Sequence, residues 1–461
     1  MRSAGTGAPP DAAAAADRAA LNGEIARVGK AIGALSRARA VDPARALDDH
    51  AVALATRDAE LRAALFRLVD VTPACRTLDD VGRHLASLIG ELDDHGRLPR
   101  AAGWAMRTKG GRVAAGAAVA AGVRHTAHRF VAGETPAAAS RELSRLWRAG
   151  IAASVDLLGE ATVSSEEADA YAAHCAAALD ELTRISRAWP ARPPLERDSL
   201  GPIARANMSV KVSSLTAELR SGAPERGIAD AGGRLHPLLA RARDLGAHLH
   251  IDMESLDSLE TTLGLVLESL DEAAFRDGPS AGVVVQAYLR ESPAFVERIL
   301  AWARRSQRRA PLTVRLVKGA YWDREVAEAQ QHGWRAPVFT DKADCDRNFE
   351  ELTRRLLDAR PLVRVAIGSH NLRSVAHAIA YNRVTGGRDE DLEVQVLRGL
   401  GDDLAHALRS LDLRVRVYSP VGDLVAGMAY LVRRLLENTS NESFLVAQAQ
   451  GLPLEELLAA P

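Results

Sequence analysis

The sequence predicts an α/β protein: a (β/α)8 TIM barrel preceded by an all-helical N-terminal module. The first observation is a set of eight short apolar runs of strand length, separated by helical stretches. Apolar parallel strands need helices on their outer face, and eight such units in about 250–300 residues have the size of a barrel. The second observation is that no strand-like alternation precedes residue 150. The eight runs are residues 151–161, 208–215, 247–254, 281–288, 311–321, 362–371, 392–399 and 414–422.

The main alternative is a doubly wound open sheet. An open sheet that bound a dinucleotide would carry GxGxxG after its first strand, and the sequence LLGEAT at residues 157–162 lacks it. Gly399 and Gly401 follow the seventh run, but the third glycine is missing. Their spacing therefore indicates a tight loop with an Asp cap rather than a nucleotide-binding turn.

The chain divides into four predicted parts. Residues 1–16 are rich in Ala, Gly and Pro and carry charges that a secretory signal would lack, which indicates a disordered leader. In residues 17–149, Leu, Ala and Val recur every three or four positions, which predicts helices throughout. The barrel is expected at residues 150–446, and a C-terminal tail at residues 447–461. The longest weakly apolar run, residues 113–122, is too short to cross a bilayer.

The composition excludes several classes of protein. With 47% apolar residues the chain can bury a large core. Its 59 Lys and Arg residues balance 60 Asp and Glu residues, and the formal charge of -1 argues against a nucleic-acid partner. Cys75, Cys175 and Cys345 are far apart and form no CxxC pair. We therefore expect a reducing, cytoplasmic compartment, with neither disulfides nor a cysteine zinc site.

Polar residues gather at the C-terminal ends of the predicted strands, where barrel enzymes carry their active sites. Lys211 and Arg315 are the most informative, because each lies inside an apolar strand and an unpaired buried charge is costly. A structural explanation stays open for each such residue, since Lys211 can pair with Asp252. Their recurrence on most strands nevertheless favours a functional site. The strand-end set is Glu160, Lys211, Asp252, Glu254, Gln286, Tyr288, Arg315, Lys318, Tyr321, Ser369, His370, Asn371, Gln395 and Tyr418.

A metal site is only weakly indicated. His248, His250 and Asp252 alternate along one run and so share a face of the strand. The two histidines precede the C-terminal end of that strand, and the sequence indicates no further ligand. We therefore predict no metal.

The last predicted strand leads into a helix that carries clustered charges. The strand is expected to break at Pro420, and Asp423 to cap the helix. Arg433, Arg434 and Glu437 lie within one turn of each other in an otherwise apolar segment. Two adjacent guanidinium groups repel unless an anion lies between them, and their planar donors suit a carboxylate. A solvated helix face with an internal salt bridge is the alternative.

Five segments resemble signature blocks of the FAD-dependent proline dehydrogenase family, in that family's order. The resemblance covers residues 150–445 and is strongest to the proline dehydrogenase half of bacterial bifunctional proline utilisation enzymes. It implies a distorted barrel that holds FAD, with the last helix lying over the barrel mouth. The segments are RLVKGAYWDREVAEAQ (315–330), PVFTDKADCD (337–346), SHN (369–371), VQVLRGLG (394–401) and YSPVGDLVAGMAYLVRRLLENTSNESF (418–444).

The resemblance implies roles for individual residues. Lys211, Arg433 and Arg434 match the family's ligands for the substrate carboxylate. Asp252 matches an essential strand-end acid, and Glu160 a residue that can pair with a gating arginine. The implied pocket-lining residues are Tyr321, Leu397 and Tyr418. The implied flavin contacts are Gln286, Arg315, Val317, Lys318, Gly319, Ala320, Trp322, Thr340, Lys342, Ser369, His370, Asn371, Gln395, Glu437, Ser443 and Phe444.

The reaction that the resemblance implies is oxidation of L-proline to Δ1-pyrroline-5-carboxylate by hydride transfer to flavin N5, the first step of proline catabolism to glutamate. Tyr418 stands where relatives that act on hydroxyproline tend to carry a smaller residue, so proline is the expected substrate. A membrane quinone is the implied electron acceptor, with peripheral contact at the inner face of the membrane. The implied downstream partner is a pyrroline-5-carboxylate (glutamate semialdehyde) dehydrogenase, in trans or in a longer parent chain.

Two other functions stay open from the residues alone: a non-flavin TIM-barrel lyase that uses Lys211 as a Schiff base, and a non-catalytic carboxylate-binding module. The sequence also differs from some bifunctional members. It starts without a ribbon-helix-helix DNA-binding segment, and it stops at Pro461 without an aldehyde dehydrogenase half. A monofunctional protein and a fragment of a longer one are both compatible with these differences.

Overall fold

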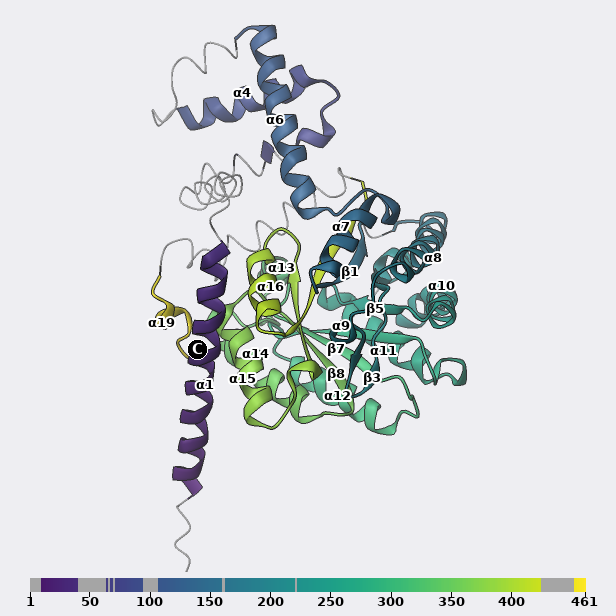
Figure 1. The fold of residues 1–461 in the computed structure, drawn as a ribbon. Helices are drawn as coiled ribbons and strands as arrows, with labels where there is room; N and C mark the ends of the chain where they lie inside the picture. Colours follow the sequence, from purple (N-terminus) through teal and green to yellow (C-terminus); the bar gives the residue numbers. More distant parts are fainter. Residues whose placement is uncertain are drawn as a thin grey trace, which may run out of the picture.

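The structure is a computed structural model that describes residues 10–39, 64, 67–68, 71–93, 107–159, 162–219, 222–423 and 452–461. Within them, eight parallel strands close into a barrel in the order β1-β10-β9-β8-β7-β6-β5-β4 (Figure 1). Each predicted run overlaps one of these strands, so the barrel prediction is confirmed and the open sheet is excluded. The strands are β1 (Ala152–Leu157), β4 (Asn207–Lys211), β5 (His248–Asp252), β6 (Ser280–Gln286), β7 (Leu312–Val317), β8 (Val363–Gly368), β9 (Leu392–Leu397) and β10 (Arg414–Val421).

Helices follow the strands along the chain and cover the outer face of the barrel (Figure 1). They are α8 (Ser165–Arg187), α10 (Pro224–Leu245), α11 (Leu256–Asp271), α12 (Ser292–Arg305), α13 (Trp322–His332), α14 (Lys342–Asp358), α15 (Leu372–Val384) and α16 (Asp402–Ser410). Shorter elements in the same region are α9 (Pro193–Glu196), β2 (Arg197–Asp198), β3 (Gly201–Pro202), η2 (Val212–Ser214), η3 (Ala273–Phe275) and η4 (Asp389–Asp391).

The barrel strands present apolar side chains to the helices and polar side chains to the lumen. In β7, Val314 and Leu316 belong to the fully buried core, whereas Arg315 between them bonds to Asp252 of β5. Successive side chains of a strand point to opposite faces, so a strand that reads as almost continuously apolar can still line the lumen with charge. The apolar runs therefore predict the strands correctly, and the few polar residues inside them form the interior of the barrel.

β10 continues through Pro420, where the sequence analysis expected a break. Pro420 pairs with Asp156 of β1, and the strand ends one residue later at Val421. On the other side, the pairing of β10 with β9 stops at Tyr418 and Leu397. Proline lacks an N–H donor, and a strand tolerates it where no neighbour needs that donor.

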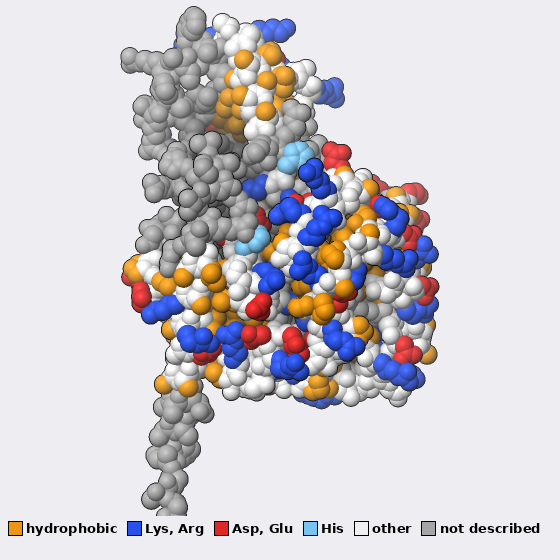
Figure 2. Space-filling model, viewed as in Figure 1, with side chains coloured by type: hydrophobic (Ala, Val, Ile, Leu, Met, Phe, Trp, Pro, Cys, Tyr) orange, Lys and Arg blue, Asp and Glu red, His pale blue; other side chains and the backbone are white. Residues whose placement is uncertain are grey.

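Helices precede the barrel, as predicted. α1 packs on α15 and α16, and its residues Ile25, Val28 and Ile32 are buried in the same core as the barrel. α4 and α6 pack on each other above the barrel (Figure 1), and Figure 2 shows hydrophobic side chains gathered on this part of the molecule. The elements are α1 (Pro10–Arg39), η1 (Thr72–Ala74), α4 (Leu78–Asp93), α6 (Lys109–Phe130) and α7 (Pro136–Arg148), with α19 (Leu454–Leu457) near the C-terminus.

The boundaries between the four predicted parts of the chain remain predictions. α1 begins at Pro10, earlier than the expected start of the helical module at residue 17, and the rest of the expected leader lies outside the described residues. Among the described helices, none combines the length and the hydropathy needed to cross a bilayer. Lys and Arg side chains are interspersed with Asp and Glu over the barrel face that Figure 2 shows.

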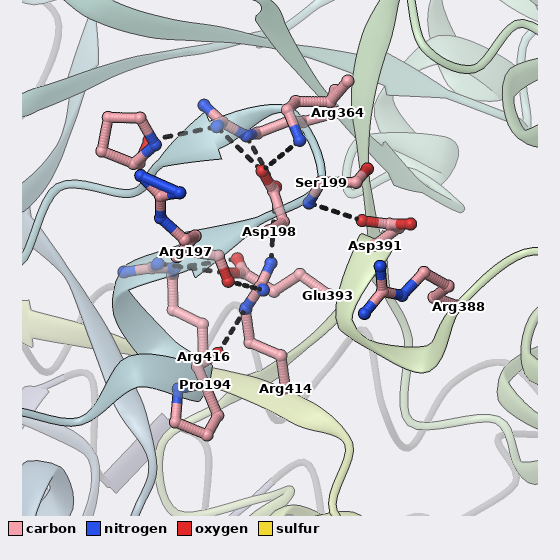
Figure 3. A network of polar contacts seen from close by, with 12 residues as sticks. Pro194, Arg197, Asp198, Ser199, Arg364, Arg388, Asp391, Glu393, Arg414 and Arg416 are labelled. Atoms are coloured by element: carbon pink, nitrogen blue, oxygen red, sulfur yellow. Dashed lines mark hydrogen bonds and ion pairs between the residues drawn. The ribbon is translucent and has the colours of Figure 1, made fainter.

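An ion-pair network occupies the N-terminal end of the barrel (Figure 3). Asp198 of β2 accepts hydrogen bonds from Arg364 Nε and Nη2 at 2.7 and 3.0 Å, and Arg414 Nη1 lies 3.6 Å from its Oδ2. Arg414 also donates to the backbone oxygens of Pro194 and Arg197, at 3.0 and 2.7 Å. The β2–β3 hairpin is thus fixed to the first residues of β8 and β10.

Glu393 is the second acid of this network. Its two carboxylate oxygens accept from Arg416 Nε and Nη2 at 2.8 and 3.0 Å, and Gln395 Nε2 donates to Oε1 at 2.6 Å. Burial alone would raise the pKa of Glu393, but the Arg416 guanidinium outweighs it and lowers the pKa from 4.5 to about 2. The carboxylate therefore stays charged, and its pairing with Arg416 holds β9 to β10 inside the lumen.

We expect Glu393→Gln to lower the free energy of unfolding by about 3 kcal/mol at pH 7, because removal of one partner leaves the Arg416 charge buried and unpaired. Urea unfolding followed by circular dichroism measures this. Glu390→Gln is the matched control, since Glu390 pairs with Arg388 at a far more exposed position. The control should change the unfolding free energy by less than about 0.5 kcal/mol.

The same pair of proteins tests the pKa of Glu393. A carboxylate whose folded pKa is lowered contributes its stability above the unfolded pKa and loses it as the pH falls through the folded pKa. The difference in stability between the wild type and Glu393→Gln should therefore shrink between pH 4.5 and about 2. A difference that stays constant over this window would contradict the assignment.

Candidate active site

Asp252, the last residue of β5, is the centre of a charged cluster at the C-terminal mouth of the barrel. Its Oδ1 accepts from Arg315 Nη1 at 2.9 Å, and its Oδ2 accepts from the Tyr418 hydroxyl at 2.6 Å. Lys211 Nζ lies 3.7 Å from the same Oδ2. The structure therefore brings four predicted site residues together from β4, β5, β7 and β10.

Asp156 of β1 belongs to this cluster, and the sequence analysis missed it. Its fully buried Oδ1 accepts from Lys211 Nζ at 2.5 Å, closer than Asp252. Glu160 is the acid predicted at the end of this strand; β1 ends at Leu157, and Glu160 lies outside the described residues. The available signal was the alternation of the strand, which places Ser154 and Asp156 on one face.

Lys211 is held in its charged form. Burial alone would lower the pKa of Lys211, but the carboxylates of Asp156 and Asp252 outweigh burial and raise it. A permanently protonated ammonium is a good ligand for an anion and a poor nucleophile.

Arg315 connects the cluster to the middle of the lumen. The side chain is 5% exposed, and its Nη1 and Nη2 both lie 3.4 Å from Ser209 Oγ. Its guanidinium also lies 5.3 Å from the centre of the Tyr418 ring, within the range of a cation–π contact. Arg315 is therefore positioned by Asp252 on one side and by an aromatic face on the other.

The predicted cofactor residues continue from the ends of β6 and β7. Gln286 Nε2 donates to Glu254 O at 3.0 Å, while the buried Gln286 Oε1 has no hydrogen-bond partner among the described residues. After Val317 and Lys318 comes Gly319, with φ of 140°, where a Cβ atom would lie 2.3 Å from the Tyr288 ring. Only glycine fits this turn, so the backbone from Gly319 to Ala320 can pass close to the aromatic ring.

Two predicted lysines share one acid beside this turn. Lys318 Nζ donates to Asp346 Oδ1, and Lys342 Nζ lies 3.0 Å from Asp346 Oδ2. Asp346, which the sequence analysis did not single out, thus holds two ammonium groups together. Tyr321 precedes α13, and Trp322 Nε1 donates to Phe339 O at 2.8 Å, next to the exposed Thr340.

Ser369, His370 and Asn371 follow β8 and are held by local bonds. Ser369 Oγ accepts from the Asn371 N–H at 3.1 Å, and Asn371 caps α15 by accepting from Ser374 N–H at 3.0 Å. His370 Nε2 accepts from the Leu397 N–H at 2.9 Å. Burial lowers the pKa of His370 to about 4, so the ring is neutral and its proton lies on Nδ1. His370 therefore offers a donor on the side away from Leu397.

Gln395 lies deeper than the other predicted cofactor residues. It is 6% exposed, and its amide nitrogen is bonded to Glu393 of the N-terminal network. Its backbone oxygen accepts from Ser369 N–H at 3.3 Å, so Gln395 links the two ends of the lumen.

Part of the predicted site lies outside the described residues. This holds for Glu160 and for the helix expected after Asp423. The other predicted residues there are Arg433, Arg434, Glu437, Ser443 and Phe444.

The two histidines of β5 form a neutral pair. His248 Nε2 and His250 Nδ1 lie 3.1 Å apart, and His248 Nδ1 lies 2.8 Å from Ser280 Oγ. Burial lowers the pKa of His248 to about 3 and that of His250 well below its ordinary value. Within the part of the chain that the structure describes, no three His, Cys, Asp or Glu side chains are arranged to hold a metal ion.

Comparison with known proteins identifies the family. Residues 139–447, more than half of the chain, match the family model described as proline dehydrogenase. Residues 22–130 match the model described as the proline utilization A N-terminal domain. The bifunctional protein PutA of Salmonella typhimurium is 33% identical over 350 residues, which are 74% of this chain and 25% of the relative. Proline dehydrogenase 1 of Bacillus subtilis (strain 168) is 27% identical over 333 residues, which are 71% of this chain and 92% of the relative.

A solved structure matches almost the whole chain. Proline utilization A from Bdellovibrio bacteriovorus, inactivated by N-propargylglycine, superposes with a TM-score of 0.87 and 31% identity. The match covers 96% of this chain and 44% of that chain, so the chain spans less than half the length of these bifunctional proteins. The barrel, its strand-end cluster and these matches agree: the chain belongs to the proline dehydrogenase family.

Proposed function

We propose that this chain is an FAD-dependent proline dehydrogenase that oxidises L-proline to Δ1-pyrroline-5-carboxylate. The observation that carries the proposal is the cluster of Lys211, Asp252, Arg315 and Tyr418 at the C-terminal mouth of a barrel of this family. The catalytic residues of TIM-barrel enzymes lie at this end of the barrel. The same residue types are arranged to bind a small carboxylate beside a flat cofactor.

The residues present fit a flavin. The oxygen of Gln286, which has no partner among the described residues, and the Nδ1–H of His370 supply an acceptor and a donor for a heteroaromatic edge. Lys318 and Lys342 supply positive charge for a pyrophosphate, and the turn at Gly319 leaves room close to the backbone. When bound, a flavin would supply the capacity to accept a hydride from the substrate.

The substrate carboxylate needs more positive charge than the described cluster provides. Lys211 is engaged by Asp156 and Asp252, and Arg315 by Asp252, so each described cation already has an acidic partner. Arg433 and Arg434 would supply the additional charge. An anion placed among these donors would gain several charge-assisted hydrogen bonds in a site with little water.

The cations also favour the reactive protonation state of the substrate. Proline must lose its ammonium proton before the ring carbon beside the nitrogen can give up a hydride. A positively charged environment lowers the pKa of an ammonium group, while it stabilises the carboxylate. Lys211 and the arginines would therefore orient proline and favour its neutral amine, and the ring of Tyr418 would pack against the substrate ring.

The two alternative functions have less support. A lyase that used Lys211 as a Schiff base would need a neutral amine, whereas Asp156 and Asp252 raise the pKa of Lys211. A non-catalytic carboxylate-binding module would not require the residues that fit a flavin. The electron acceptor that we propose is a membrane quinone at the inner face of the membrane, and the enzyme that consumes the product is a pyrroline-5-carboxylate dehydrogenase.

The first test is an absorbance spectrum of the purified chain before and after L-proline is added without oxygen. We expect a flavin band that proline bleaches, because reduction removes the oxidised chromophore. A flavin band that proline leaves unchanged would support the proposed cofactor and exclude proline as the substrate. A chain that binds no flavin when refolded or reconstituted with FAD would exclude the proposed function as a whole.

We expect Asp156→Asn to lower kcat/KM for proline by about ten- to a hundredfold, the cost of a lost hydrogen bond to a charged group. Flavin content should not change. Asp180→Asn is the control, because Asp180 pairs with Arg241 on the exposed outer face; a similar loss in both variants would contradict this role.

We expect Arg434→Met to weaken proline binding by at least about thirtyfold, because the substrate carboxylate loses a charged partner. Flavin content, measured by absorbance after gel filtration, should stay at the wild-type level. Arg304→Met, at the exposed end of α12, serves as the control. Equal losses of flavin and of proline affinity would show that Arg434 belongs to the cofactor site instead.

A further inference from the structure

Residues 129–133, which we call the linker strap, comprise the last two residues of α6 and the first three of its connection to α7, and they pass the C-terminal mouth of the barrel. Figure 1 shows α6 reaching the barrel beside α7, where the end of β10 emerges. None of the site residues expected from the sequence lies in the strap. Its contacts nevertheless reach two segments that carry them.

The first of these segments is the loop between β9 and α16. Arg129 Nε donates to Gly399 O at 3.1 Å, and the Phe130 side chain is 4% exposed. Gly399 has φ of 80°, and a Cβ atom there would lie 2.9 Å from the Phe130 ring and 3.0 Å from Arg129 O. The strap therefore packs directly on the backbone of this loop, at a place where only glycine fits.

The inner side of the same loop is bonded to the candidate active site. The N–H of Leu397 donates to His370 Nε2 at 2.9 Å, and the N–H of Arg398 donates to Tyr418 O at 3.1 Å. Tyr418 in turn donates to Asp252 at 2.6 Å. Tyr418 thus connects the loop, which bonds to its backbone oxygen, with the centre of the charged cluster, which accepts from its hydroxyl.

The second segment is the end of β10. The N–H of Ala132 donates to Pro420 O at 2.8 Å, and the N–H of Gly422 donates to Gly133 O at 3.0 Å. These bonds form a short parallel bridge between Gly133 and Val421, which extends the pairing of β10 beyond the barrel. In the sequence, the two arginines expected to bind the carboxylate follow Gly422.

α7 holds the loop from a further side. Glu142 Oε1 accepts from Arg398 Nη1 at 2.5 Å. Burial alone would raise the pKa of Glu142, but Arg145 and Arg398 outweigh burial and lower it to about 2. The loop is therefore bracketed between the strap with α7 outside and the active-site residues inside.

We propose that the linker strap is a positioning element for the substrate side of the site, with Arg129 and Phe130 as its positioning residues. The inference rests on the proposed function. The strap contacts the loop of Leu397 and the strand of Tyr418, whereas Gln286, Lys318 and Lys342 of the predicted cofactor site make no bond to the strap within the described part of the chain. The strap reaches His370, a predicted flavin contact, through the Leu397 N–H alone of the contacts described above, so loosening the strap should weaken proline binding more than flavin binding.

The test uses the full flavin-loaded chain with Arg129→Met, Arg129→Lys and Arg141→Met. Arg141 is an exposed arginine on the neighbouring α7 and serves as the matched control. For Arg129→Met we expect KM for proline to rise about three- to tenfold, as for loss of one hydrogen bond, with kcat within about twofold and flavin content unchanged. Arg129→Lys should restore most of the affinity, because lysine can still donate to Gly399 O.

A second measurement separates binding from turnover. Cyclopentanecarboxylate has the ring and carboxylate of proline without its amine, and its affinity can be followed by the change in flavin absorbance. This affinity should fall in Arg129→Met by the same factor as KM rises. If Arg129→Met does not fold, Phe130→Leu carries the same test, since it keeps an apolar side chain on Gly399.

Three outcomes would overturn the inference. Arg129→Met could match Arg141→Met in KM and in analogue affinity, which would leave the strap without a role in binding. It could lower kcat or flavin content at unchanged KM, which would place its effect elsewhere. A wild-type chain that proline does not reduce would overturn the proposed function, and this inference with it.

Discussion

The pairing of charges around Asp252 is the constraint on which the rest of the site depends. A carboxylate inside a barrel is costly to bury unless donors surround it, and Asp252 has Arg315, Tyr418 and Lys211 around it. These three donors come from three different strands, so they meet only when the closed barrel sets the register. The fold and the site therefore depend on each other. Strand pairing places the donors, and the ion pairs offset the cost of burying charge in the lumen.

The sequence predicted the parts of this arrangement that depend on local pattern. The eight strands were found because their outward side chains are Val, Leu and Ile, and Lys211 and Arg315 stood out because each interrupts such a run. Asp156 was missed because its importance comes from a neighbour 55 positions away in the chain. The contact of Arg129 with Gly399 spans 270 positions and has no local signature at all. Periodicity reports which face of a strand is buried, but it does not report which residue lies opposite.

The two ends of the lumen use similar residues for different purposes. At the N-terminal end, Glu393 and Arg416 satisfy each other through two parallel bonds, and Gln395 occupies a further lone pair. At the C-terminal end, Gln286 Oε1 has no hydrogen-bond partner in the described parts of the chain, and the His370 ring carries its proton on Nδ1, away from Leu397. Saturated polar groups fix strands to each other, whereas unsaturated ones can bind a ligand. Charge in a strand is therefore a weak sign of function until its bonds are counted.

The buried imidazoles of the barrel bear on how activity should respond to acidity. Burial lowers the pKa of His248 to about 3 and the pKa values of His370 and His377 to about 4, and His250 is shifted in the same direction. None of these four rings changes its charge between pH 5 and 9. These rings therefore do not change the electrostatic field at a bound ligand across that range. A titration seen there would come from a group other than these rings, and the substrate amine, which must lose its proton before hydride transfer, is one such group.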